Sequence, residues 1–173
     1  MNGEDQALIG YFEQLLIPPD STEADSEVRM TAERRSGERF QVQPFRVGKL
    51  RFAALMEQLS GVLALESEVI WLPGQPGWAS GRVSVAGREL WAASPIGVIA
   101  PGLRMSGPFP WVLLPRSGEL ALLCHEVEEP CWWRAEKVRW RTERVSRPWL
   151  IGMQADPPCP LIDVEQLVQE IKR

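Results

Sequence analysis

The chain has 173 residues, a net charge of −4 and no run of apolar residues long enough to cross a membrane. Its length suits one domain with its own core. Residues 1–40 hold nine acidic and four basic side chains, and the rest is nearly neutral, which disfavours a nucleic-acid-binding protein. Cys124, Cys131 and Cys159 cannot all pair and form no CxxC motif. We therefore expect reduced thiols in a cytoplasmic protein without direct membrane insertion.

Residues 5–17 predict a short amphipathic helix that ends before Pro18-Pro19. Its apolar residues recur at the spacing of one helical face and are Leu8, Tyr11, Phe12, Leu15 and Leu16. A helix this short is marginal alone in water. Its apolar face must therefore dock, either on its own domain or as a tethered contact with a partner protein.

Residues 18–38 are polar and charged, and they predict a flexible acidic linker because they have too little apolar surface to bury. A folded domain is expected over residues 39–173. It begins with a β-hairpin whose turn is Gly48-Lys49. A short helix from Met56 and a strand up to Leu65 follow.

The stretch 69–94 divides the ordered chain into two β-rich halves. It opens with an apolar run, and residues 73–77 (PGQPG) then force a change of direction. We expect Trp78 to anchor this break. Strands on either side of an Ala86-Gly87 turn come next.

The second half predicts further strands and a closing helix. Strands are expected at residues 111–114, 120–124, 138–145 and 148–153, and a loop at residues 155–160. Asp163 is placed to cap the last helix, with Gln166 completing a capping box. The pattern of about nine strands with short helices indicates a mainly β protein built from small barrels.

Catalytic motifs are lacking. The sequence has no GxGxxG, GxxxxGK[ST], GxSxG or HExxH pattern. Cys124 and His125 are neighbours on a predicted strand, so their side chains point to opposite faces and do not form a nucleophile–base pair. We expect a buried Cys124, a surface His125, no enzymatic activity, no cofactor and no metal.

The segment 132–149 (WWRAEKVRWRTERVSRPW) carries six basic residues, two acidic residues and four tryptophans. Basic residues among aromatics are typical of small barrels that bind single-stranded nucleic acid, which is the alternative function. Exposed tryptophan and arginine also form the centres of protein–protein interfaces. The two acidic residues, Glu136 and Glu143, dilute the positive charge and favour the second interpretation.

Residues 40–171 resemble the CheW-like domain family of bacterial chemotaxis adaptors. Four segments carry the resemblance: FRVGKLRFAALMEQLSGV at 45–62, LPGQPGWASG at 72–81, VSVAGRELWAASPIGVIAPG at 83–102 and WLIGMQADPPCPLIDVEQL at 149–167. The last segment and VRWRTERVSRPW before it are most similar to the ParP-type branch of this family.

The resemblance implies two packed small five-stranded β-barrel subdomains with short helices and a C-terminal helix. It implies a non-catalytic scaffold that binds the histidine kinase CheA, the cytoplasmic tips of chemoreceptors, or both. For the ParP-type branch it further implies a ParA-like positioning ATPase as a partner and a place in polar chemosensory arrays.

This sequence departs from the coupling CheW proteins at two positions. They commonly carry Leu-Arg-Gly where this chain has Val85-Ala86-Gly87, and an aspartate near the position of Ser94. The missing arginine favours the specialised branch. We expect partner contacts at two stretches, through Arg82, Ala86, Arg88 and Trp91 in the first and Trp140, Arg147 and Trp149 in the second.

Overall fold

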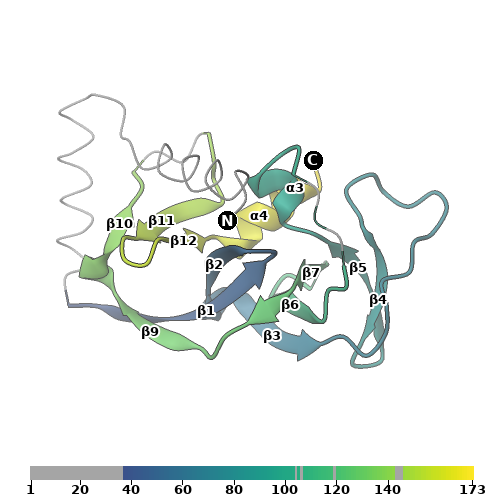
Figure 1. Ribbon diagram of the computed structural model, residues 1–173, viewed down its shortest axis with the longest axis horizontal. Helices are drawn as coiled ribbons and strands as arrows, with labels where there is room; N and C mark the ends of the chain where they lie inside the picture. Colours follow the sequence, from purple (N-terminus) through teal and green to yellow (C-terminus); the bar gives the residue numbers. More distant parts are fainter. Residues whose placement is uncertain (1–36, 104, 106, 119, 143–145) are drawn as a thin grey trace.

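The computed structural model describes residues 37–173 apart from 104, 106, 119 and 143–145. The predicted helix at 5–17 and nearly all of the predicted linker at 18–38 lie outside the described residues. The described chain forms two β-sheets with short helices between and beside them (Figure 1). This arrangement confirms the expected mainly β fold.

The larger sheet has seven strands in the order β10-β11-β12-β2-β1-β8, with β9 also paired to β1. Its strands are β1 (Arg39–Val47), β2 (Leu50–Leu55), β8 (Glu126–Val127), β9 (Cys131–Arg134), β10 (Val138–Trp140), β11 (Leu150–Gln154) and β12 (Cys159–Ile162). The 3₁₀ turn η2 (Ala135–Lys137) joins β9 to β10 and so links the two ends of the sheet. Inside, the rings of Phe40 on β1 and Trp140 on β10 lie 5.6 Å apart, so the sheet curls on itself.

The smaller sheet has five strands in the order β3-β6-β7-β5-β4. These are β3 (Leu59–Ala64), β4 (Gly81–Val85), β5 (Arg88–Ala93), β6 (Trp111–Pro115) and β7 (Ala121–Cys124). Backbone hydrogen bonds of 2.8 and 2.7 Å between Ile70 and Arg82 tie the segment after β3 to β4. These bonds link the two ends of this sheet as well.

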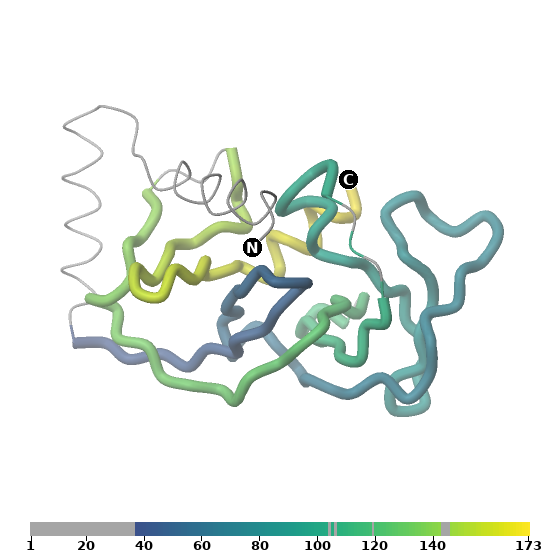
Figure 2. The backbone as a smooth tube through the Cα atoms, viewed as in Figure 1, coloured from purple at the N-terminus to yellow at the C-terminus, as the bar shows by residue number. Residues whose placement is uncertain are grey.

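A single apolar cluster, here called the shared core, joins the two sheets. It takes residues from both sheets, from α3 (Ile96–Ile99) and from α4 (Val164–Ile171), and includes Phe45, Phe52, Leu113, Leu122, Ile99 and Leu167. Figure 2 shows the yellow C-terminal segment at the centre of the molecule. The predicted cap is confirmed, because the Gln166 backbone N–H donates to Asp163 Oδ1 at 3.1 Å.

The hairpins and the last helix are confirmed, whereas several strands differ from the prediction. The strand expected at 138–145 ends at Trp140, and the loop expected at 155–160 gives way to β12 at Cys159. Proline is disfavoured within sheets because it lacks an N–H group. Here Pro160 pairs only with β11, and pairing with β2 starts at Leu161. The short strands β8 and β9 both pair with β1, far away in sequence.

Gly152 on β11 lies close to β10, which gives a test of this packing. A Cβ atom there would lie 2.7 Å from the Arg139 carbonyl oxygen and 2.9 Å from Val138 Cγ1. We therefore expect Gly152→Ala to lower the free energy of unfolding by about 1–3 kcal/mol, measured by urea denaturation. Gly97→Ala in α3 is the matched control, since a Cβ there meets no described atom within 4 Å. Equal stability of Gly152→Ala and the wild type would contradict the pairing of β10 with β11.

Candidate functional site

The β4–β5 hairpin ends in a two-residue turn formed by Ala86 and Gly87. Both residues have positive φ, 48° and 75°, as a type I′ turn requires. An alanine in this conformation costs about 1–2 kcal/mol, a cost that glycine avoids. Ala86 and Arg88 are exposed, so the tip offers its backbone and one guanidinium group to a partner.

Arg82 and Trp91, both expected at the site, face each other across the same hairpin. The Arg82 guanidinium carbon lies 4.9 Å from the centre of the Trp91 ring, and Arg82 Nε lies 4.0 Å from Glu89 Oε2. The Trp78 ring meets Trp91 edge-on, with ring centres 6.4 Å apart. Trp78 therefore anchors the segment 73–77, as predicted, and Arg82 is held by contacts within its own domain.

An apolar loop, Ile70–Leu72, is the most exposed apolar feature beside this hairpin. Ile70, Trp71 and Leu72 are 58%, 64% and 37% exposed. The segment between β3 and β4 that carries them extends at the right-hand end of the molecule (Figure 1). Exposed large apolar side chains next to one another mark an interaction surface.

Polar contacts of the backbone, and not packing of these side chains, hold the apolar loop in place. Besides the bonds between Ile70 and Arg82, the Leu72 N–H donates to Gln75 Oε1 at 3.0 Å. The Gln75 Nε2 group in turn donates to the Ala79 carbonyl at 2.7 Å. A surface fixed in this way loses little conformational freedom on binding. The sequence showed this apolar run but not its exposure.

The second expected stretch is largely buried. Trp140 is 6% exposed, and its Nε1–H donates to the Ala135 carbonyl at 2.9 Å. Trp149 is 3% exposed and belongs to the shared core. Both side chains are therefore removed from the candidate surface, because alternation along β10 turns Trp140 inward and Trp149 packs in the shared core. Arg147 is half-buried and lies in the turn before β11. Tyr11, Phe12, Leu15 and Leu16 lie outside the described residues.

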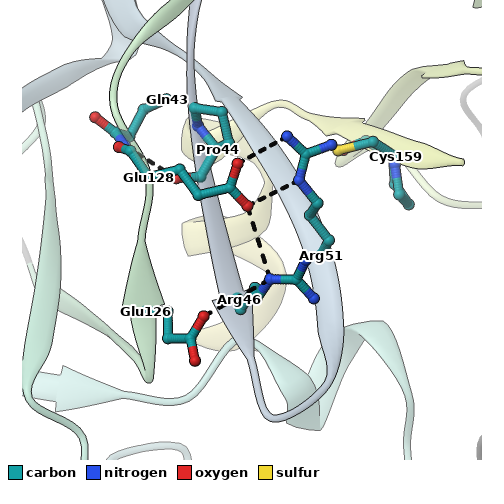
Figure 3. Close-up of polar contacts among 8 residues, drawn as sticks. Gln43, Pro44, Arg46, Arg51, Glu126, Glu128 and Cys159 are labelled. Carbon is teal, nitrogen blue, oxygen red and sulfur yellow. Dashed lines mark hydrogen bonds and ion pairs between the residues drawn. The ribbon is translucent and has the colours of Figure 1, made fainter. Parts of the chain in front are cut away.

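An ion-pair network joins β1, β2 and the β8 segment of the larger sheet (Figure 3). Arg51 Nε and Nη2 donate to the two carboxylate oxygens of Glu128 at 2.9 and 2.8 Å. Arg46 Nε lies 3.7 Å from Glu128 and 3.8 Å from Glu126. The hydrogen bond from Arg51 lowers the pKa of Glu128, and the same bond raises the pKa of Arg51. The spacing of residues in the sequence does not indicate this network. Arg46 lies on β1, Arg51 on β2 and Glu126 on β8, and Glu128 directly follows β8.

The cysteines and the histidine do not form a reactive pair. Burial raises the pKa of Cys124 and of Cys159 to about 12 each, so both thiols are protonated at neutral pH. His125 is half-buried and not a free surface residue: its Nδ1 accepts the Gly48 N–H at 2.8 Å, and its ring lies 4.6 Å from Phe109. Among the described residues, no group of three metal-ligating side chains is close enough to hold a metal ion.

Comparison with known proteins gives a likeness of fold. No protein-family model and no curated protein matches the sequence. Among solved structures, the chain is similar to the scaffolding protein TtCheW from Thermoanaerobacter tengcongensis, with a TM-score of 0.58 and 12% identity. The match covers 72% of this chain and 88% of that one. The chain thus has a CheW-like fold. None of the described helices is long and apolar enough to cross a membrane.

The ion pair between Arg51 and Glu128 predicts a pH-dependent stability. Because the pKa of Glu128 in the folded protein lies below its ordinary value of 4.5, the ionised carboxylate stabilises the fold. This contribution is complete above pH 4.5 and is lost as the pH falls through the lowered pKa. Glu128→Gln should therefore be less stable than the wild type at neutral pH, and this difference should shrink in acid.

Urea denaturation of the two proteins at neutral and acidic pH measures this effect. The control is the same Glu128→Gln change in an Arg51→Gln background, where the pH-dependent difference should be much smaller. A difference that does not change with pH would contradict the role of the pair.

Proposed function

We propose that the chain is a non-catalytic adaptor of bacterial chemotaxis signalling. The observation that carries this proposal is the exposed apolar loop Ile70–Leu72, which stands on a rigid, hydrogen-bonded backbone at the end of a CheW-like fold. Such a surface suits a protein that binds without chemistry. The protonated buried thiols and the engaged His125 support a non-catalytic role.

The partners that fit this adaptor are the histidine kinase CheA and the cytoplasmic tips of chemoreceptors. TtCheW, which has a similar fold, is a scaffolding protein. The ParP-type resemblance of residues 138–168 extends the proposal to a ParA-like positioning ATPase and to polar, array-associated localisation in the cytoplasm. Ala86, in place of the usual arginine, leaves the hairpin tip less charged and supports this specialised role.

The nucleic-acid alternative loses support from the burial of its tryptophans. Of the four in the segment 132–149, Trp133, Trp140 and Trp149 are between 3% and 6% exposed, while Trp132 is 57% exposed. Bases of a single-stranded nucleic acid stack on exposed aromatic rings. One exposed tryptophan in this segment offers few stacking sites for such a nucleic acid. A protein partner therefore fits this chain better.

The apolar loop provides the direct test of the adaptor proposal. Ile70→Ser combined with Trp71→Ser should weaken binding to the regulatory domain of CheA by about tenfold or more, because central apolar anchors supply most binding energy at an interface. Thermal stability should change little, since both side chains are more than half exposed. Calorimetric titration of the full chain measures the affinity.

Trp132→Ala is the matched control, because Trp132 is an equally exposed tryptophan on the other sheet. It should leave the affinity for the kinase domain within about twofold of the wild type. Wild-type affinity in the double variant would exclude the apolar loop as the contact. Absence of binding by the wild type would exclude this kinase domain as the partner.

The N-terminal segment gives a second contact in this proposal. Phe12→Ala combined with Leu16→Ala should weaken the binding of one partner, tested with the ATPase and the kinase domain in turn, while the melting temperature stays almost unchanged. Gln14→Ala, on another face of the expected helix, is the control. A large fall in melting temperature would instead place the helix in the core of its own domain.

A further inference from the structure

The strand β3 forms an open edge of the smaller sheet. Among the described strands it pairs with β6 alone, and it lies at the lower margin of the molecule in Figure 1. The sheet closes further along the chain, where Ile70 pairs with Arg82. Ser60, Leu63 and Ala64 on β3 are exposed. The strand therefore has one side on which another strand can pair.

The backbone of β3 points alternately toward β6 and away from it. The Leu65 N–H, just after β3, donates to the Pro110 carbonyl at 2.8 Å, and the register pairs Leu63 with a residue of β6. In an antiparallel pair every second residue exchanges hydrogen bonds with its partner, and the residues between point their backbone groups to the other side. Val62 and Ala64 therefore each direct an N–H and a C=O group away from the sheet. Neither residue has a partner for these groups in the described part of the chain.

An irregularity in the pairing fixes where this free edge begins. The register between β3 and β6 shifts between Leu59 and Gly61, and the Ser60 hydroxyl donates to the Leu114 carbonyl at 3.2 Å. The free edge is thus residues 61–64, which we call the β3 edge. Proteins commonly protect such an edge with a lysine, a proline or a covering element. Residues 61–64 contain neither a charge nor a proline, and Leu63 adds an apolar side chain that is 37% exposed.

Three glutamates flank the β3 edge in the chain. Glu57 precedes it, Glu66 and Glu68 follow it, and all three are exposed. None of them takes part in an ion pair within the part of the chain that the structure describes. One basic residue, Arg116, lies near Glu57, since its backbone N–H donates to the Gln58 carbonyl at 2.9 Å. The two ends of the edge together therefore keep an excess of negative charge.

This charge makes a second copy of the chain a poor occupant of the β3 edge. An antiparallel pair of two such edges, centred on Val62, would bring Glu57 of one copy close to Glu66 and Glu68 of the other. Like charges that face each other across a strand pair or an interface weaken it. A segment with basic residues meets the opposite situation and is attracted to the same glutamates.

We propose that the β3 edge binds an extended, basic segment of a partner protein, which adds a further strand to the smaller sheet. The backbone of the segment pairs with the outward N–H and C=O groups of Val62 and Ala64. An apolar side chain of the segment packs against Leu63, and its basic residues face the flanking glutamates. This contact is additional to the apolar loop and does not depend on the adaptor proposal.

Fluorescence anisotropy with the full chain tests this proposal. The probe is a fluorescein-labelled, amidated peptide Lys-Val-Thr-Val-Thr-Lys, whose composition favours an extended backbone, and its counterpart has Glu in place of both lysines. We expect saturable binding of the basic probe and binding of the acidic one that is weaker by about fivefold or more.

Ala64→Pro is the variant that tests the backbone contact. It removes an outward N–H but no hydrogen bond to β6, and proline is tolerated on an edge strand at such a position. It should weaken binding of the basic probe by about fivefold or more, the value of one lost hydrogen bond. Ala64→Ser, which keeps the N–H, is the matched control and should bind within about twofold of the wild type. Melting curves of both variants confirm folding.

Amide hydrogen exchange, followed by NMR on the wild-type full chain, identifies the backbone groups that bind. In the free chain the amides of Val62 and Ala64 should exchange quickly, and the Leu63 amide slowly because it is bonded to β6. Saturating probe should slow exchange at Val62 and Ala64 by about fivefold or more.

Four results would overturn the proposal: slow exchange at Val62 and Ala64 in the free chain, no saturable binding, equal binding of the two peptides, or wild-type affinity in a folded Ala64→Pro variant. A dimer in sedimentation velocity that Ala64→Pro dissociates would overturn it in favour of a second copy of this chain.

Discussion

The structure depends on one apolar cluster that neither sheet could form alone. Phe45 and Phe52 from the larger sheet, with ring centres 5.6 Å apart, are at most 1% exposed. They join Leu113 and Leu122 of the smaller sheet and Leu167 of α4 in the shared core. A curled sheet of a few short strands buries too little apolar surface to be stable by itself. The two sheets therefore stabilise each other through this core, and α4 completes it.

This arrangement leaves the apolar loop outside the core. Ile70, Trp71 and Leu72 are outside the shared core, so their exposure does not weaken the fold. Trp132 is likewise exposed, while its neighbour Trp133 fills the inside of the larger sheet. The apolar loop rests on a hydrogen-bonded backbone, which limits the entropy lost if a partner binds there.

Local signals in the sequence predicted much of this fold. The turn at Gly48-Lys49, the turn at Ala86-Gly87 and the cap at Asp163 each depend on residues within a few positions. In contrast, β8, β9 and β12 exist because they pair with strands β1 and β2, which are far away in sequence. Short strands of this kind carry little local signal.

The candidate surfaces could be predicted only in part. Trp132 and Trp133 are neighbours on a strand, so one of them had to point outward, but pairing with β1 decides which. Trp140 was a surface candidate because exposed tryptophan and arginine form the centres of interfaces, but its side chain packs inside the larger sheet. The Arg46–Glu128 contacts required the β1–β8 pairing and Gln43. No pattern of residues in the sequence predicts this pairing of β8 with β1.

The central claim is that this chain joins two signalling proteins at the same time. Co-sedimentation tests it most directly, with vesicles that carry a chemoreceptor cytoplasmic fragment and with soluble CheA, each with and without the full chain. The account predicts that the chain increases the amount of kinase in the pellet, and that Ile70→Ser with Trp71→Ser abolishes the increase. If the chain leaves the kinase in the supernatant, or recruits it equally well with both changes in place, the account of this protein as an adaptor acting through the apolar loop is wrong.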